Sequence, residues 1–159
     1  QLVDEVLLVD EPALEHAVSL LLQIEKTVVE GAGAAGLAAV LDHPERFAGR
    51  KVGLVLCGGN IDTRLLANVL LRDLVRSGRM ARLRITLQDR PGALFRVMGV
   101  FDAHNVNILE IHHQRIFTSL PAKGLFTEIE CEARDEAQMR GLVAALRDKG
   151  YSVEEVAVD

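Results

Sequence analysis

Residues 80–92 read Met80-Ala-Arg-Leu-Arg-Ile-Thr-Leu-Gln-Asp-Arg-Pro-Gly92. Apolar and polar side chains alternate along the first part of this stretch, with Leu83, Ile85 and Leu87 on one side and Arg82, Arg84 and Thr86 on the other. Such alternation is typical of a β-strand that buries one face and exposes the other to water. The segment Asp89-Arg-Pro-Gly92 then turns the chain into an apolar pattern with helical spacing.

The rest of the second half continues this pattern of short elements. The order predicts a βαββαβ chain, the ferredoxin-like arrangement in which two helices cover one face of a four-stranded antiparallel sheet. The expected elements are a helix with Leu94, Val97, Met98 and Phe101; a strand from Val106 to about Ile116, with a bulge at Ile108–Ile111; a loop around Ser119–Gly124; a strand from Leu125 to Cys131; a helix from Asp135 to Gly150; and a last strand at Tyr151–Val156.

Two motifs lie at matching places in this order. Asp89-Arg-Pro-Gly92 follows the first strand, and Asn105-Val-Asn-Ile-Leu109 opens the second. Together with the element order they resemble the ACT domain, a small regulatory module that binds amino acids. We therefore expect an ACT domain over residues 80–159. The resemblance implies an effector site, at a subunit interface, made by Asp89, Pro91, Gly92, Ala93, Leu94, Asn105 and Asn107.

The chemistry of these residues suits an amino acid. N–H groups at a helix start favour a carboxylate, side-chain amides suit an ammonium group, and Leu94 leaves room for a branched aliphatic side chain. A plain turn, in which Pro91 sets the backbone angle, is the alternative interpretation of Asp89–Gly92.

The first half, residues 1–79, has a different, α/β pattern. Asp10-Glu11-Pro12 predicts the start of a helix that runs to about Lys26. We expect a closely packed helix in the small-residue stretch Gly31–Leu41, a loop at His43–Gly49, strands at Val6–Val9 and Lys51–Leu56, and a glycine turn at Cys57–Asp62. A helix to Gly78 follows, with Ile61, Leu65, Leu66, Val69, Leu70, Leu74 and Val75 on its buried face.

Two segments of this half resemble the C-terminal signatures of the pyridoxal-phosphate-dependent threonine dehydratases, relatives of the tryptophan synthase β chain. They are Val29-Glu-Gly-Ala-Gly-Ala-Ala35 and Leu56-Cys-Gly-Gly-Asn-Ile-Asp-Thr-Arg64. The resemblance implies that residues 1–79 are the C-terminal segment of such a catalytic domain. The chain is then the C-terminal, regulatory part of an enzyme that converts L-threonine to 2-oxobutanoate and ammonia, and the pathway's end product, isoleucine or valine, is the expected effector.

The same resemblance implies the cofactor residues. Cys57 takes the position beside the pyridine nitrogen, where a neutral thiol leaves that nitrogen largely unprotonated and favours β-elimination of water. Gly58, Gly59 and Asn60 shape the turn that holds it, and Glu30 takes a position near the ring. The lysines, Lys26, Lys51, Lys123 and Lys149, lie outside the family's catalytic context, and no glycine run resembles the phosphate loop. We therefore expect this chain alone to bind no cofactor and to be inactive.

Other interpretations of these motifs are weaker. Gly31-Ala-Gly-Ala-Ala-Gly36 matches the dinucleotide pattern G-x-G-x-x-G, but it lacks a long strand before it, and the next strand ends in Cys57 where an acid would be needed. Tight helix packing explains the glycines better. Cys57 by itself is also compatible with a buried core thiol. His112 and His113 point to opposite faces of a strand and cannot chelate a metal together.

Composition limits the function classes. The net charge is −5 and the Lys and Arg residues are scattered, which argues against nucleic acid as a partner. The longest apolar runs, such as Ala34–Leu41, are too short to cross a membrane. Cys57 and Cys131 are far apart, which fits a reducing cytoplasm. We expect a homo-oligomer that pairs through ACT domains. The alternative is a stand-alone amino-acid-binding or dimerisation module without catalytic activity.

Overall fold

A computed structural model describes residues 3–114 and 124–156 of the chain. It divides the chain into two compact units, unit 1 (Gln1–Asp73) and unit 2 (Leu74–Asp159). The division falls inside helix α4 (Thr63–Arg76), N-terminal to the boundary at Met80 that the sequence pattern indicates. The loop expected around 119–124 lies outside the described residues, apart from Gly124.

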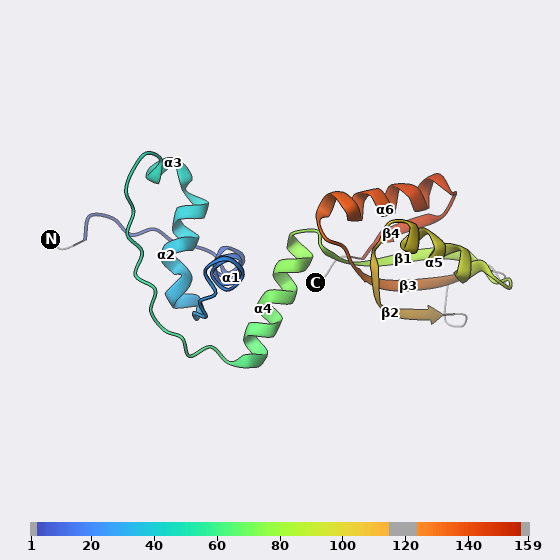
Figure 1. The fold of residues 1–159 in the computed structure, drawn as a ribbon, viewed down its shortest axis with the longest axis horizontal. Helices are drawn as coiled ribbons and strands as arrows, with labels where there is room; N and C mark the ends of the chain where they lie inside the picture. Colours follow the sequence, from blue (N-terminus) through green and yellow to red (C-terminus); the bar gives the residue numbers. More distant parts are fainter. Residues whose placement is uncertain (1–2, 115–123, 157–159) are drawn as a thin grey trace. The chain divides into compact units, whose positions relative to one another are not determined.

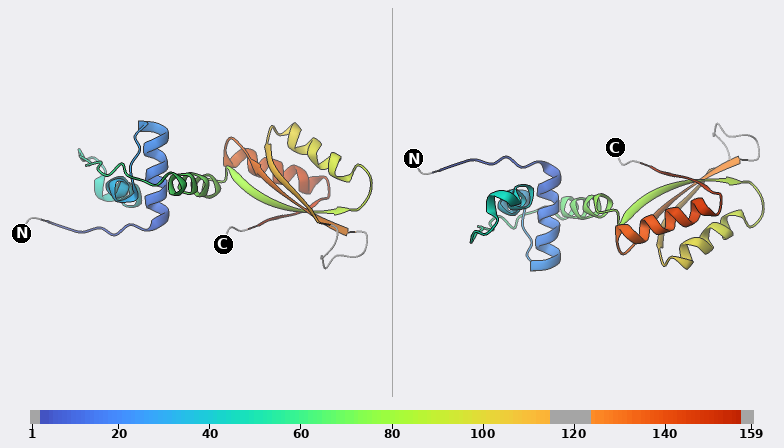
Figure 2. Two further views of the ribbon diagram at one scale, coloured as in Figure 1. Left: turned by 90° about the horizontal axis from the view of Figure 1, so that it is seen from below. Right: turned by 90° about the horizontal axis from the view of Figure 1, so that it is seen from above.

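Unit 2 has the predicted βαββαβ order. Its strands are β1 (Met80–Gln88), β2 (Asn107–Gln114), β3 (Gly124–Glu132) and β4 (Ser152–Glu155), and its helices are α5 (Ala93–Ala103) and α6 (Glu136–Asp148). The sheet is antiparallel with the order β2-β3-β1-β4. Both helices lie on the same side of this sheet (Figures 1 and 2). The predicted fold class, α/β with a ferredoxin-like domain, is confirmed.

The register of the strands fixes which side chains meet the helices. β1 pairs with β3 from Met80 opposite Glu132 to Gln88 opposite Gly124. Between β2 and β3 the register shifts between Ile108 and Glu110, so the predicted bulge is confirmed. An extra residue in one strand reverses the facing of the side chains beyond it.

The two faces of the sheet differ as the alternation in β1 predicts. Leu83, Ile85 and Leu87 are buried under the helices, with Val97 and Phe101 of α5 and Leu142 and Leu146 of α6. The other face is charged: Arg82 pairs with Glu130 at 2.6 Å and Arg84 with Glu128 at 2.7 Å. One face of the sheet therefore makes the core, and the other is solvated.

Unit 1 is built from helices. α1 (Glu11–Leu20) begins at Asp10, whose carboxylate accepts a hydrogen bond of 2.9 Å from the N–H of Ala13. It continues as a π-helical segment, η1 (Leu21–Glu25), which ends at the left-handed residue Lys26, close to the predicted end. α2 (Gly31–Asp42) packs against α1. The buried core of this unit consists of Ala17, Val18, Leu21, Val29, Ala34, Ala38 and Val69.

Three predictions for unit 1 are wrong. Lys51–Leu56 forms no strand and its residues are exposed, and Val6–Val9 likewise forms none. A strand needs a hydrogen-bonded neighbour, and no strand occurs among residues 3–73. The predicted loop at His43–Gly49 contains one helical turn, α3 (Pro44–Phe47), because Pro44 favours a helix start.

The buried face expected on α4 is only partly formed. Of its predicted residues, Val69 is buried, Ile61 and Leu66 pack partly buried against the core of unit 1, and Leu65 is 53 % exposed.

Candidate functional site

The two segments predicted to hold the cofactor meet in unit 1. The N–H of Glu30, at the start of α2, donates a hydrogen bond of 2.7 Å to the carbonyl of Gly58. A Cβ on Gly33 would fall 1.8 Å from the carbonyl oxygen of Cys57, so only glycine allows the turn to lie this close to the helix. Gly33 thus serves packing, as predicted for this stretch, whereas a Cβ on Gly31 would meet nothing within 4 Å.

The turn itself depends on Gly58. Its φ of +76° is in the left-handed region, and a Cβ there would lie 2.3 Å from Oε1 of Glu30. The Glu30 carboxylate therefore lies against the turn. A Cβ built on Gly59 would lie 3.6 Å from the carbonyl oxygen of Val28. The side chains of Cys57 and Asn60 are exposed, so the thiol can be reached from solution.

In unit 2, five of the predicted effector residues line one open groove of about 700 Å³ at the end of β1. They are Asp89, Pro91, Gly92, Ala93 and Leu94. Gly92 has a φ of +77°, and a Cβ there would come within 3.2 Å of Nη1 of Arg96. The groove is completed by Gln88, Arg90, Phe95, His113 and Leu125.

The two predicted asparagines lie at the opposite end of the sheet. Asn107 pairs with Glu132, which also pairs with Met80, whereas Asp89 follows the far end of β1. Along a nine-residue strand this is a separation of roughly 25 Å. Asn105 adopts a left-handed conformation with φ 51° directly after α5, and its carbonyl accepts a hydrogen bond from Gln138. One copy of the chain does not bring the asparagines to the groove.

Of the groove residues that the sequence analysis did not predict, His113 is the one with an imidazole. Its Nδ1 lies 2.9 Å from the hydroxyl of Thr127, a side chain that is completely buried on β3. The bulge in β2 sets this arrangement, because it puts His113 on the helix side of the sheet. The sequence analysis placed the bulge but did not follow the facing of the residues after it.

His112 points to the other face, as predicted for adjacent strand residues, and its Nε2 lies 3.2 Å from Oε1 of Glu110. Glu110, His112 and Glu130 have possible ligand atoms within 4.8 Å of one another. Glu130 is already paired with the Arg82 guanidinium, which opposes a cation there. This geometry therefore gives no metal site.

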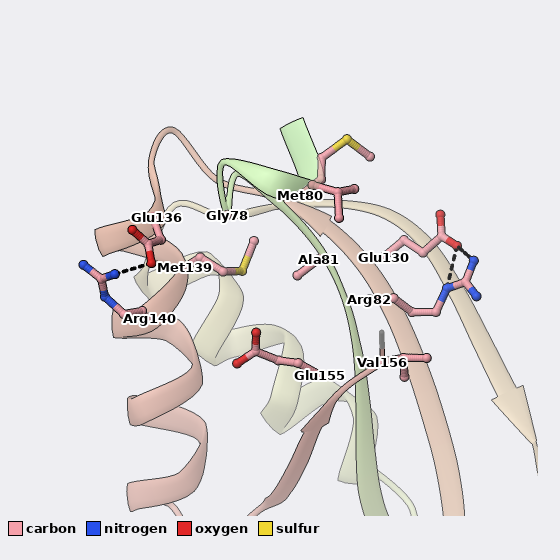
Figure 3. Close-up of a pocket in the computed structure, with 11 residues that line it drawn as sticks. Gly78, Met80, Ala81, Arg82, Glu130, Glu136, Met139, Arg140, Glu155 and Val156 are labelled. Atoms are coloured by element: carbon pink, nitrogen blue, oxygen red, sulfur yellow. Dashed lines mark hydrogen bonds and ion pairs between the residues drawn. The ribbon is translucent and has the colours of Figure 1, made fainter. Parts of the chain in front are cut away.

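A second hollow in unit 2, of about 630 Å³, lies near the start of β1 (Figure 3). Met80, Ala81 and Met139 supply apolar lining, and charged residues surround them. Four of these charges pair with each other, Glu136 with Arg140 and Glu130 with Arg82, and Glu155 also lines the hollow. None of the residues predicted for a site lines this hollow.

The two thiols differ in environment. Cys131 is buried, its Sγ lies 3.5 Å from the Ala81 carbonyl, and burial raises the pKa of this thiol to about 12. Cys57 is exposed. Among the helices of the described ranges, none has the length and apolar character needed to cross a membrane.

Comparison with known proteins agrees with the fold of unit 2. Residues 81–148 match the ACT domain family, so unit 2 is an ACT domain. A solved structure, the ACT domain from GTP pyrophosphokinase of Chlorobium tepidum, covers 49 % of this chain and 97 % of its own at 20 % identity, with a TM-score of 0.40.

Two curated relatives extend the match to unit 1. L-threonine ammonia-lyase of Thermotoga maritima is 37 % identical over 95 % of this chain, and that of Geobacter sulfurreducens is 39 % identical over 96 %. The chain belongs to the threonine ammonia-lyase family. It spans 37 % and 38 % of the length of these two relatives.

Proposed function

We propose that the chain is the regulatory part, with the adjoining piece of the catalytic domain, of a threonine ammonia-lyase that converts L-threonine to 2-oxobutanoate and ammonia. The observation that carries this proposal is the meeting of Glu30 and Gly33 with Cys57 and Gly58. These residues are distant in the sequence, and they come together as a cofactor-binding locus requires.

The residues fit one end of pyridoxal phosphate. Cys57 presents an accessible thiol on a glycine turn, where it would contact the ring nitrogen as a neutral partner, while Glu30 lies beside the turn. When bound, the cofactor supplies an electron sink for the elimination. Gly58, Gly59 and Asn60 hold the turn in shape. The lysine and phosphate cradle that such a cofactor also needs are not provided by these residues, so we assign the chain only the ring-nitrogen side.

Unit 2 then supplies regulation. The groove at Asp89–Leu94 has the size of a small-ligand site, and Leu94 and Leu125 give it apolar walls that suit the aliphatic side chain of isoleucine or valine. Asn105 and Asn107 would contribute only from a second copy, which agrees with a homo-oligomer paired through ACT domains.

Titration calorimetry of the chain with L-isoleucine, L-valine, L-threonine and L-serine tests the effector part. We expect binding of isoleucine or valine at up to millimolar concentration, weakened by Gly92→Val and, in an oligomer, by Asn107→Ala. Binding that both substitutions leave unchanged would place the site elsewhere.

The cofactor part is tested by spectroscopy. Mixed with pyridoxal phosphate, this chain should form no stoichiometric borohydride-reducible adduct and should produce no 2-oxobutanoate from threonine. A longer protein that contains the chain and a catalytic lysine should do both. In that protein Cys57→Ser should keep most activity, whereas Cys57→Asp should change the products because it would protonate the ring nitrogen.

The second candidate function is a stand-alone amino-acid-binding or dimerisation module. The observation in its favour is that unit 2 closes its own core within residues 83–146. Amino-acid binding by a protein in which Cys57 and Glu30 substitutions change no activity would favour this candidate.

A further inference from the structure

His113 lines the groove of unit 2 and also contacts a side chain of the core. Its Nδ1 is 2.9 Å from the hydroxyl of Thr127, which is 0 % exposed. A buried hydroxyl needs a hydrogen-bond partner, and here the imidazole provides it. The ring is thus fixed at one nitrogen by a residue of the core, while the rest of the ring lines the groove.

The hydrogen bond at Nδ1 determines whether Nε2 donates or accepts a hydrogen bond. If the Thr127 hydroxyl donates to Nδ1, the proton of the neutral imidazole resides on Nε2, which then donates. If the ring is protonated, Nε2 still donates. The opposite tautomer, with the proton on Nδ1, would make Nε2 an acceptor. A carboxylate in the groove is an acceptor, so it selects the two forms in which Nε2 donates. The N–H of Ala93 already donates to the carbonyl of Arg90 at 3.1 Å.

We propose that His113, held by Thr127, binds the carboxylate of the amino-acid effector through Nε2 and thereby sets the groove's selectivity for a free carboxylate. The inference rests on the effector function proposed above and names a residue for it. Thr127 acts as a positioning residue, since it contacts the imidazole and lies in the core.

Several charged groups act on this histidine. The turn brings Asp89 and Arg90 to the groove, and α5 brings Arg96 beside Gly92. On β2 and β3 the neighbours His112 and Glu128 point to the other face of the sheet. The two arginines favour a carboxylate in the groove, and Asp89 opposes it. Protonation of the imidazole adds a charge-assisted hydrogen bond to the carboxylate.

The experiment compares L-isoleucine with L-isoleucinamide, which lacks the carboxylate, by calorimetry on the full chain from about pH 8 to about pH 6, the range in which histidines commonly titrate. We expect isoleucine to bind more tightly than the amide, and the affinity for isoleucine itself to rise as the pH falls. His113→Gln and Thr127→Val should each weaken isoleucine binding by about tenfold and remove this rise.

Two matched variants separate positioning from general damage. Thr127→Ser keeps the hydroxyl and should bind isoleucine within about twofold of the unsubstituted chain. Thr86→Val removes a threonine hydroxyl from the solvated face of β1 and should also leave binding unchanged. Because His113 is at the surface, His113→Gln should fold even if Thr127→Val does not.

The outcomes distinguish the two proposals. Isoleucine binding that survives His113→Gln with the same preference over the amide overturns this inference and leaves the effector function standing. An affinity for isoleucine that falls as the pH falls also overturns it, because Nε2 would then be an acceptor. If the unsubstituted chain binds none of isoleucine, valine, threonine and serine, the effector function fails and this inference with it.

Discussion

The two units of this chain differ in how they bury their apolar residues. In unit 2 the large side chains Phe101, Leu83 and Leu142 are completely buried between the sheet and its helices. The core of unit 1 consists mainly of alanines and valines, and Val55 and Leu65 remain 84 % and 53 % exposed. Unit 2 therefore holds its own fold, whereas unit 1 presents apolar surface that further chain could cover.

This difference also separates the two proposed functions. The proposed effector groove is lined by Gln88 of β1, His113 of β2 and Leu125 of β3, and otherwise by the turn after β1 and the start of α5. Paired strands therefore support one side of it. The cofactor turn at Cys57 is fixed on one side only, by the contact of Gly33 and Glu30. We expect regulation to be a property of unit 2 alone and catalysis to require more protein than unit 1 provides.

Hydrogen exchange gives the largest expected contrast between the units. Amides of β1 and β3 should exchange at least about a thousandfold more slowly than those of residues 51–60, because the sheet amides open only when unit 2 unfolds. Mass spectrometry of the exchanging chain measures this. Protection of residues 51–60 similar to that of β1 would show that they are paired in solution.

Thiol labelling compares the two units at one cysteine each, Cys57 in unit 1 and Cys131 in unit 2. At pH 8 a thiol with a pKa of about 12 is ionised to about one part in ten thousand, and Cys131 is also shielded by the core. Ellman's reagent should therefore modify Cys57 in the native chain and Cys131 only after denaturation. Cys57→Ser should abolish native labelling and Cys131→Ala should leave it unchanged. Two equivalents of native labelling would contradict the assignment.

The sequence predicted the structure of unit 2 more fully than that of unit 1. The alternation around Leu83, the turn at Asp89–Gly92 and the bulge in β2 are local signals, and unit 2 has the partners that satisfy them. The strand expected at Lys51–Leu56 failed because strand formation depends on a neighbouring strand, which the local pattern does not reveal. His113 was missed for a related reason, since its facing depends on the register beyond the bulge.

A matched pair of leucine substitutions tests the packing directly. Leu142→Ala in α6 removes a completely buried side chain and should lower the free energy of unfolding by about 2–5 kcal/mol. Leu65→Ala in α4 removes a half-exposed one and should cost less than about 1 kcal/mol. Urea unfolding followed by circular dichroism measures both, and the fluorescence of Tyr151, the one tyrosine of the chain, reports on unit 2. Equal costs would mean that Leu65 is covered in solution.

The smallest expected effect concerns the start of α6. The Asp135 carboxylate accepts a hydrogen bond of 2.8 Å from the N–H of Gln138, and this bond, with a second from Arg134, holds the pKa of Asp135 below its usual value. The Gln138 side-chain oxygen accepts a hydrogen bond of 2.7 Å from the N–H of Arg134, so a capping box forms with a shift of one residue.

Since the pKa of Asp135 is lower in the folded chain than in the unfolded chain, its carboxylate stabilises the fold above the unfolded value, and this stabilisation is lost as the pH falls through the folded value. Asp135→Asn keeps a capping oxygen but does not titrate. At about pH 6 it should melt a few degrees below the unsubstituted chain, and the difference should shrink as the pH falls below the unfolded pKa of Asp135. Thermal melts followed by Tyr151 fluorescence at several pH values measure the difference. A gap that does not change with pH would mean that the carboxylate charge contributes nothing to this cap.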